Sequence, residues 1–237
     1  MDAQLGPPLR PTQYAESILV TSILDGTYPA GTPLPGERLM ADQIGVTRPT
    51  LRETLQRLAC EGWVKIQHGK PTVVNDYWLE GGLSMISTLA KYTKFLPNGF
   101  ITQLLEVRAV LLPPVAGLTA IRQPDKMLDF LSRKPVPEDE ETTLAVYDWE
   151  LQMLLTRGCG NPVYALIFND FASIYKQMAA AYFREEKSRN ASLSYYRELE
   201  QAIAHADHSV EKVVKAAMRK SIEIWREIRP LARNMQS

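Results

Sequence analysis

Arginine and threonine side chains gather in residues 46–74, the stretch VTRPTLRETLQRLACEGWVKIQHGKPTVV. Arg48 and Arg52 lie one helical turn apart, and Thr47 and Thr50 stand on either side of the first of them. An arginine at the start of a helix can donate two hydrogen bonds to the O6 and N7 atoms of guanine. Threonine hydroxyls and the free amides of a helix N-terminus suit phosphate oxygens. These residue types in this spacing indicate a surface that contacts DNA.

A second polar group, His68-Gly69-Lys70, lies between two β-prone runs at residues 63–67 and 72–74. The arrangement predicts a hairpin whose tight turn is permitted by Gly69. A narrow tip with one cation and one hydrogen-bonding ring fits the minor groove of DNA. The alternative for both groups is an ordinary solvated helix face followed by an ordinary surface hairpin.

The distribution of charge favours DNA contact, although the total charge does not. The 237 residues include 27 Lys+Arg and 27 Asp+Glu, so the formal net charge of +0 removes any argument from bulk basicity. From Arg38 to Lys70, however, there are six Lys/Arg and three Asp/Glu, a local balance of +3. The positive charge is therefore concentrated on one face, to which Arg38 also contributes.

Short helices must position these side chains. A first helix is predicted with Thr12 as its N-terminal cap and Gly26 as its end, and a second over residues 37–44, stopped by Gly45. A third is capped by Thr47 and ended by Gly62. Its buried stripe is formed by Leu51, Leu55 and Leu58, at i, i+4 and i+7. Two short helices joined by a tight turn and followed by a hairpin predict a winged helix-turn-helix.

The rest of the chain is predicted to be helical. Helices are expected at residues 83–94, 98–121, 124–132, 139–157, 162–183, 188–205 and 208–229, with a kink at the proline pair of the second. The Glu80-Gly81-Gly82 stretch is the best linker candidate. The predicted fold is therefore mostly α. Its parts are a winged helix-turn-helix domain at residues 1–78, a linker at 79–83 and an all-α effector-binding bundle at 84–237.

An apolar stripe in the second domain allows two interpretations. Its members share one face of the helix predicted at residues 162–183 and are Phe168, Phe171, Tyr175, Met178 and Tyr182. Any helical bundle needs such a stripe in its core, and the same stripe could line a pocket for a ligand.

The stretch from residue 31 to 74, GTPLPGERLMADQIGVTRPTLRETLQRLACEGWVKIQHGKPTVV, closely resembles the winged-helix domain of the GntR regulators. Its His-Gly-Lys-Pro hairpin looks like that of the fatty-acid-responsive FadR branch, and the resemblance continues through the later motifs LLEVR, GNPVY, YF and EIW. The resemblance implies DNA contacts by Arg38, Thr47, Arg48, Thr50, Arg52, His68, Gly69 and Lys70. Pro49 stands where close relatives often have threonine, so it can supply no hydroxyl to a phosphate.

For the second domain, the resemblance implies a long-chain acyl-CoA effector bound between helices. The residues expected to line or gate that site are Arg108, Tyr175, Tyr182, Ser221 and Trp225. Met218 and Ile222 depart from the family pattern, which has small residues there, and both add bulk beside the ligand. The alternative is a GntR-type regulator that senses a different small metabolite, or one with no ligand response.

A metal site is not expected, because the common metal-binding relatives use an aspartate and three histidines. Asp148 matches the acidic position, but Gln152 stands where the first histidine would be. The chain has three histidines, His68, His205 and His208, and one of them lies in the hairpin. The second domain therefore cannot assemble a three-histidine site.

Other protein classes lack support in the sequence. There is no phosphate-cradling glycine loop, nucleophile elbow or HExxH motif, so neither an enzyme nor a cofactor is expected. Cys60 and Cys159 are distant in the chain and are interpreted as reduced thiols. No signal peptide or membrane span is predicted, and we expect a cytoplasmic protein. A homodimer on a palindromic operator is expected, because one short helix reads too few bases. A helical ligand-binding protein with incidental DNA affinity is the competing hypothesis.

Overall fold

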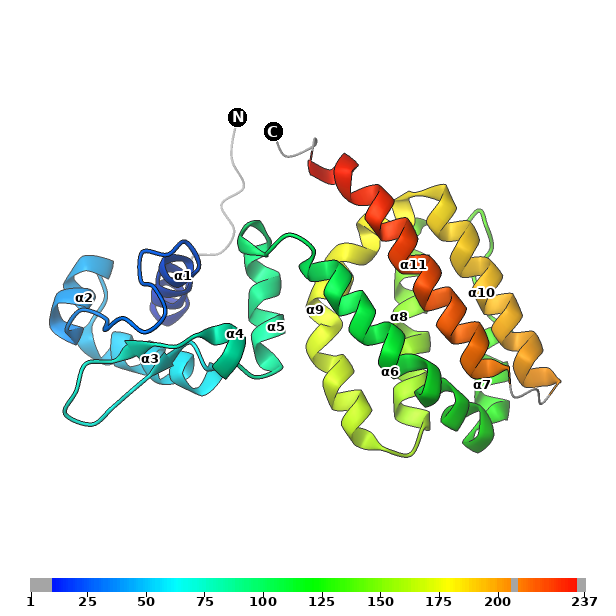
Figure 1. Ribbon diagram of the computed structural model, residues 1–237, viewed down its shortest axis with the longest axis horizontal. Helices are drawn as coiled ribbons and strands as arrows, with labels where there is room; N and C mark the ends of the chain where they lie inside the picture. The colour runs from blue at the N-terminus through cyan, green and yellow to red at the C-terminus, as the bar shows by residue number, and fades with distance from the viewer. Residues whose placement is uncertain (1–9, 206–208, 234–237) are drawn as a thin grey trace. The chain divides into compact units, whose positions relative to one another are not determined.

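The computed structural model describes residues 10–205 and 209–233 of the chain. They form two compact units that divide between Leu96 and Pro97 (Figure 1). The first unit is a small mixed domain and the second is entirely helical within the described residues.

The first unit contains five α-helices, one 3-10 helix and a two-stranded sheet in its described part. In chain order these are α1 (Pro11–Leu24), α2 (Glu37–Ile44), α3 (Arg48–Glu61), β1 (Val64–Lys65), β2 (Val73–Val74), α4 (Tyr77–Glu80), α5 (Ser84–Leu89) and η1 (Ala90–Phe95). The three leucines of the predicted stripe on α3 are buried, as is Trp63 at the start of the hairpin. Their burial fixes α3 against α1 and α2.

The hairpin pairs Val64 with Val74 and Lys65 with Val73, in antiparallel register. A loop between α1 and α2 joins the ribbon, because the Leu34 N–H donates to the Thr72 carbonyl over 2.8 Å. The hairpin is thus anchored at its base on both sides.

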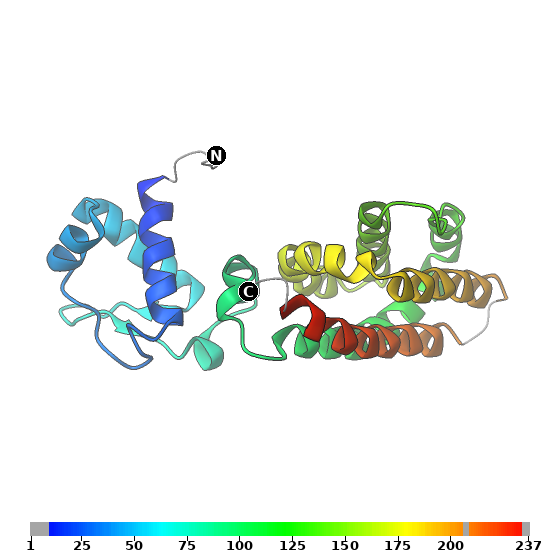
Figure 2. The same ribbon diagram turned by 90° about the horizontal axis from the view of Figure 1, so that it is seen from above.

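The second unit consists, in its described part, of α6 (Phe100–Arg122), α7 (Pro124–Leu131), α8 (Glu141–Gly158), α9 (Pro162–Arg184), α10 (Glu186–Ala204) and α11 (Val210–Arg233). Helices α6 and α11 lie side by side along one side of the unit, and α9 and α10 lie along the opposite side (Figures 1 and 2). The helices enclose a space between these two layers, where the candidate effector site lies.

Three details differ from the predictions. Helix α1 begins after Arg10, whose backbone N–H donates to Gln13 Oε1 over 3.2 Å, so Thr12 is not its cap. The short helix α4 was not predicted; Asp76 caps it by accepting from the Trp78 N–H over 3.1 Å. The helix predicted over residues 83–94 is two pieces, α5 and η1, and non-helical angles occur at Tyr92. Helix α6 continues through its two prolines, Pro113 and Pro114.

The segment after the hairpin belongs with the first unit, which continues to Leu96. The Thr88 hydroxyl on α5 donates to Glu61 at the end of α3 over 3.2 Å, and the rings of Trp63 and Tyr77 are 5.0 Å apart. The residues predicted as the linker, 79–83, form the end of α4 and its connection to α5. A boundary at residues 79–83 remains a proposal.

Among the described helices, α6 alone is long and apolar enough to cross a membrane by length and composition. Its inner face is buried within the second unit, at Leu112, Val115 and Ala116. A core helix of a folded bundle meets the same criteria.

Candidate nucleic-acid interface and effector pocket

The turn between α2 and α3 is fixed from both sides. Gly45 adopts φ 78°, a left-handed conformation that favours glycine, and its N–H donates to the Ala41 carbonyl over 2.9 Å. On the other side Thr47 caps α3, because its Oγ1 accepts from the Thr50 N–H over 3.3 Å. The two hydroxyls of these threonines are 2.8 Å apart. The sequence prediction of this turn and of this cap is confirmed.

Exposed side chains surround the N-terminal turn of α3. Arg48, Pro49 and Arg52 line an open groove together with Glu53 and Gln56. Arg48 is exposed on the first turn of the helix. A guanidinium at this place has two parallel donors that it can direct at a base edge or a phosphate.

Arg52 is held by α2. Its Nη2 donates to Glu37 Oε2 over 2.6 Å and its Nε to the same oxygen over 3.2 Å. These hydrogen bonds raise the pKa of the Arg52 guanidinium, which stays charged. Arg38, the next residue on α2, is exposed. The packing of α2 against α3 therefore gives exposed cations to two neighbouring helices, and the Glu37 carboxylate orients one of these cations, Arg52.

The hairpin tip is exposed to solvent at His68, Gly69 and Lys70. Gly69 adopts φ 71°, so an L side chain at this position would be strained. The Lys70 N–H donates to the Gln67 carbonyl over 3.3 Å and closes the turn. The tip thus presents one ammonium and one imidazole on a narrow turn.

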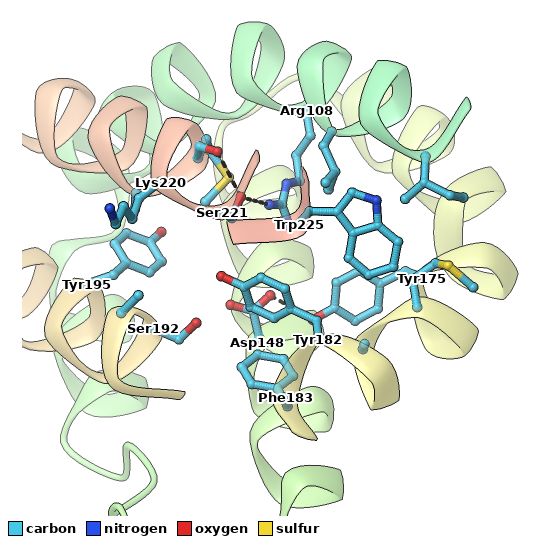
Figure 3. Close-up of a pocket in the computed structure, with 17 residues that line it drawn as sticks. Arg108, Asp148, Tyr175, Tyr182, Phe183, Ser192, Tyr195, Lys220, Ser221 and Trp225 are labelled. Carbon is cyan, nitrogen blue, oxygen red and sulfur yellow. Dashed lines mark hydrogen bonds between the residues drawn. The ribbon is translucent and has the colours of Figure 1, made fainter. Parts of the chain in front are cut away.

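All five residues predicted to bind an effector line one cavity in the second unit: Arg108, Tyr175, Tyr182, Ser221 and Trp225 (Figure 3). They come from α6, α9 and α11. The cavity, including space that opens to solvent, measures about 640 Å³. Figure 3 shows Arg108 extending from its helix toward Ser221, with Tyr182 and Asp148 on the other side of the same space.

Arg108 is the unusual residue of this cavity, since only 9% of it is exposed. Its Nη2 donates to Ser221 Oγ over 2.6 Å, and its Nε has no hydrogen-bond partner among the described residues. A buried guanidinium without a full set of acceptors is costly unless a ligand supplies them. The arrangement suits a ligand with an anionic or carbonyl oxygen.

Asp148 lies on the floor of the cavity but its oxygens are already occupied. Oδ2 accepts from the Tyr175 hydroxyl and from Gln152 Nε2, each over 2.7 Å, and Oδ1 accepts from the Tyr196 hydroxyl over 3.0 Å. Burial and the neighbouring carboxylate raise the pKa of both tyrosines, which are therefore neutral donors. Burial likewise raises the pKa of Tyr182 to about 12. Sequence reasoning considered Asp148 as a metal-ligand position, and it did not identify Tyr196 at all.

A second, apolar chamber adjoins the first. The two chambers share five residues, which are Ile101, Leu105, Arg108, Tyr175 and Met178. The second is further lined by Leu104, Trp149, Gln152, Phe168, Phe171 and Ile174. The apolar stripe on α9 therefore serves both purposes considered from the sequence, because Phe168 and Phe171 are buried core residues and all five members line one chamber or the other. An amphipathic ligand fits a chamber that contains a few polar groups and is joined to an apolar one.

The two departures from the family pattern are both buried. Met218 is 4% exposed and lines the first chamber. Ile222, one helical turn further along α11, is 8% exposed. Met218 thus takes up volume inside the cavity that a smaller residue would leave to a ligand.

No group of three or more metal-binding side chains comes together among the described residues. Gln152 donates to Asp148, so it occupies that carboxylate with a hydrogen bond. His205 is exposed at the end of α10, and His208 lies outside the described residues.

Comparison with known families defines the class of this protein. Residues 11–74 match the bacterial regulatory proteins of the gntR family, and residues 75–236 match the FadR C-terminal domain. A solved structure described as "Lar controls the expression of the Listeria monocytogenes agr system and mediates virulence" shares the fold. Its TM-score is 0.61 at 14% identity, and the match covers 93% of this chain and 99% of that one. The class is that of gntR-type regulatory proteins, which are not enzymes.

Curated relatives narrow the class further. The chain is 38% identical over 226 residues to the "Fatty acid metabolism regulator protein" of Shewanella sp. (strain MR-7), covering 92% of this chain and 91% of the relative. It is 39% identical over 227 residues to the protein of the same name from Shewanella baltica (strain OS155), covering 92% of each chain. The chain belongs to the FadR family of gntR-type regulators.

Proposed function

We propose that this chain is a cytoplasmic, homodimeric transcription regulator of fatty acid metabolism whose binding to a palindromic operator is modulated by a long-chain acyl-CoA. The observation that carries the proposal is the pairing of two sites in one chain. One is a capped helix with exposed cations beside a basic hairpin. The other is a chamber that contains a buried and partly unpaired arginine and adjoins an apolar one.

In the first site, α3 enters the major groove with Arg48 reading a base edge. Arg38, Thr47, Thr50 and Arg52 act at the same end of α2 and α3, on bases or on phosphates. The hairpin tip, His68-Gly69-Lys70, enters the adjacent minor groove. Support comes from the exposure of both cationic surfaces and from the fixed turn between α2 and α3, which sets the angle of the reading helix.

In the second site, Arg108 and Ser221 bind oxygens of the effector, and its hydrocarbon chain occupies the apolar chamber. Tyr175 stands between the two chambers, while Tyr182 and Trp225 line the first. Because the tyrosines are neutral at physiological pH, they donate hydrogen bonds without adding charge. The sensing of a different metabolite is the second candidate, and the volume that Met218 occupies favours it.

Binding in the second unit must alter the affinity of the first for the proposal to hold. Coupling free energies between sites are typically about 1–3 kcal/mol, which changes affinity roughly 5- to 150-fold. Two copies are required, because an operator with two half-sites one helical turn apart has two-fold symmetry.

The DNA part of the proposal is tested by selecting duplexes from a random library with the full-length protein. The expected result is a palindromic sequence bound by two chains per duplex, as measured by sedimentation. Recovery of unrelated sequences, bound with a steep dependence on salt, would support the competing hypothesis of incidental DNA affinity.

A further inference from the structure

The hydroxyl of Tyr195 is a buried polar group inside the first chamber. Tyr195 lies on α10, and Figure 3 shows its ring beside Ser192, with the hydroxyl directed into the space between the helices. Only 5% of Tyr195 is exposed, and its hydroxyl has no hydrogen-bond partner among the described residues. A buried hydroxyl without a partner is costly, and an oxygen of a ligand can remove that cost. Tyr195 is therefore a candidate for ligand contact in addition to the five residues of the effector site.

Tyr195 and Arg108 leave two buried polar atoms of one chamber without partners, the tyrosine hydroxyl and the arginine Nε. Burial raises the pKa of Tyr195, the Asp148 carboxylate raises it further, and the charge of Arg108 opposes the rise. The hydroxyl is thus neutral, it can donate a hydrogen bond, and it lies near enough to Arg108 to be affected by its charge. If Arg108 binds one oxygen of the effector, a second ligand oxygen is the simplest partner for Tyr195.

The second chamber indicates where along the ligand this oxygen lies. Among the described residues that line this chamber, the one hydroxyl is that of Tyr175, which donates to Asp148 over 2.7 Å. An oxygen at the far end of a hydrocarbon chain would enter this chamber and be left unpaired. The oxygen that meets Tyr195 must therefore lie near the carbonyl end of the chain, within the first chamber.

The positions of α6 and α10 separate the two ligand oxygens. These helices belong to opposite layers of the second unit, so Arg108 and Tyr195 approach the chamber from different sides (Figures 1 and 2). Carbon 3 of an acyl group is the first position at which a methylene lies between the carbonyl carbon and a second oxygen-bearing carbon. Ser192, which also lines the first chamber and is buried, can accept a hydrogen bond from a hydroxyl at that carbon.

We propose that the effector is a long-chain 3-hydroxyacyl-CoA, and that the Tyr195 hydroxyl donates a hydrogen bond to the oxygen on carbon 3. Arg108 and Ser221 bind the carbonyl, and the rest of the hydrocarbon chain enters the second chamber. Tyr195 is thus a specificity-determining residue, because an acyl group without the hydroxyl leaves its own hydroxyl unpaired. The inference rests on the proposed function, since it names the class of acyl-CoA that the same site binds.

The test is titration calorimetry of the full-length chain with hexadecanoyl-CoA and with each enantiomer of 3-hydroxyhexadecanoyl-CoA, below the concentrations at which they form micelles. The original chain should bind the better enantiomer roughly 3- to 10-fold more tightly than the unsubstituted ligand, which is the net gain from one hydrogen bond. Tyr195→Phe keeps the ring and removes the hydroxyl. In this variant the two affinities should become equal.

Tyr164→Phe is the matched control. It also removes one tyrosine hydroxyl, from a residue of α9 that lines neither chamber, and it should keep the preference of the original chain. Thermal unfolding checks that both variants fold, and Tyr195→Phe should be at least as stable as the original, because a buried hydroxyl without a partner is removed. The comparison of ligands in the original chain decides the question even if a variant fails to fold.

Equal affinity of the original chain for the hydroxylated and unsubstituted ligands would overturn the inference and leave the proposed function standing, with solvent as the partner of Tyr195. A preference that persists in Tyr195→Phe would also overturn it. An equal loss of affinity for both ligands in that variant would do the same, because the hydroxyl would then contact a part that both ligands share. Binding of neither ligand to the original chain would refute the proposed effector itself.

Discussion

Two arginines of α3 illustrate how position decides what a side chain contributes. Arg48 lies exposed on the first turn, whereas Arg52 is held by the hydrogen bonds that it donates to Glu37. A held guanidinium has less freedom to lose on binding, but it must share its donors with the carboxylate. We therefore assign base reading to Arg48 and a supporting contact to Arg52.

Replacement of Arg48 by alanine should relax the choice of base and cost about 1–3 kcal/mol in operator binding. Competition binding against operators with single base changes measures both effects. Arg133→Ala is the control, since Arg133 is an exposed arginine of the second unit that pairs with Asp129. If the variant still discriminates between operator bases as the original does, Arg48 is not the reading residue.

Arg108→Met should weaken effector binding while leaving the fold at least as stable. A hydrogen bond to a charged group contributes about 1.5–3 kcal/mol, so acyl-CoA affinity should fall by roughly 10- to 150-fold. The free energy of unfolding should not decrease, because a buried guanidinium with an unpaired Nε is removed. Titration calorimetry and urea unfolding measure the two quantities. Unchanged acyl-CoA affinity would show that Arg108 does not bind the effector.

Met218 controls the volume of the first chamber. Met218→Ala should shift preference toward longer acyl chains, because it removes side-chain atoms that line the cavity. It should also lower the free energy of unfolding by about 2–5 kcal/mol, as buried methionine truncations do. A series of acyl-CoA molecules of increasing length measures the preference. An identical ranking in both chains would mean that Met218 does not limit the ligand.

At the scale of elements, Thr47 has two roles: it caps α3, and it is a proposed DNA contact. Thr47→Ala removes the oxygen that accepts from the Thr50 N–H and should cost about 1 kcal/mol of stability. Thr47→Ser, which keeps the hydroxyl, is the matched control. Urea unfolding measures the loss, and equal stability of the two variants would contradict the assigned role of the cap.

Local signals explain which elements could be predicted from the sequence. Thr47, Gly45 and Gly62 each act within a few residues, so the bounds of α2 and α3 follow from capping chemistry. The break between α5 and η1 has no such signal, and the start of α1 involves a hydrogen bond from the Arg10 backbone N–H to the Gln13 side chain. Arginine at the N-cap position is not among the usual residue preferences, and its side chain makes no capping hydrogen bond here.

The residues of the candidate sites also divide into those that the sequence could predict and those that it could not. The five effector residues were named through family resemblance, and periodicity placed Tyr175 and Tyr182 on one helix face. The contact of Tyr196 with Asp148 joins residues that are 48 apart in the chain. Pairings at such separations depend on the packing of whole helices, which a single sequence does not specify.

At the scale of the whole molecule, the protein consists of two units whose chemistry is different. The first places cations on an exposed helix and hairpin, while the second buries an arginine and an aspartate around a cavity. Zero net charge is compatible with DNA binding, because affinity depends on where the cations lie.

The most direct measurement is titration of the selected operator complex with oleoyl-CoA while the fraction of bound DNA is followed at fixed salt. Operator affinity should change by roughly 5- to 150-fold at saturation, in line with a typical coupling free energy. Coenzyme A without the acyl chain is the control and should have little effect. An operator affinity that stays the same at saturating oleoyl-CoA would contradict effector control by this ligand.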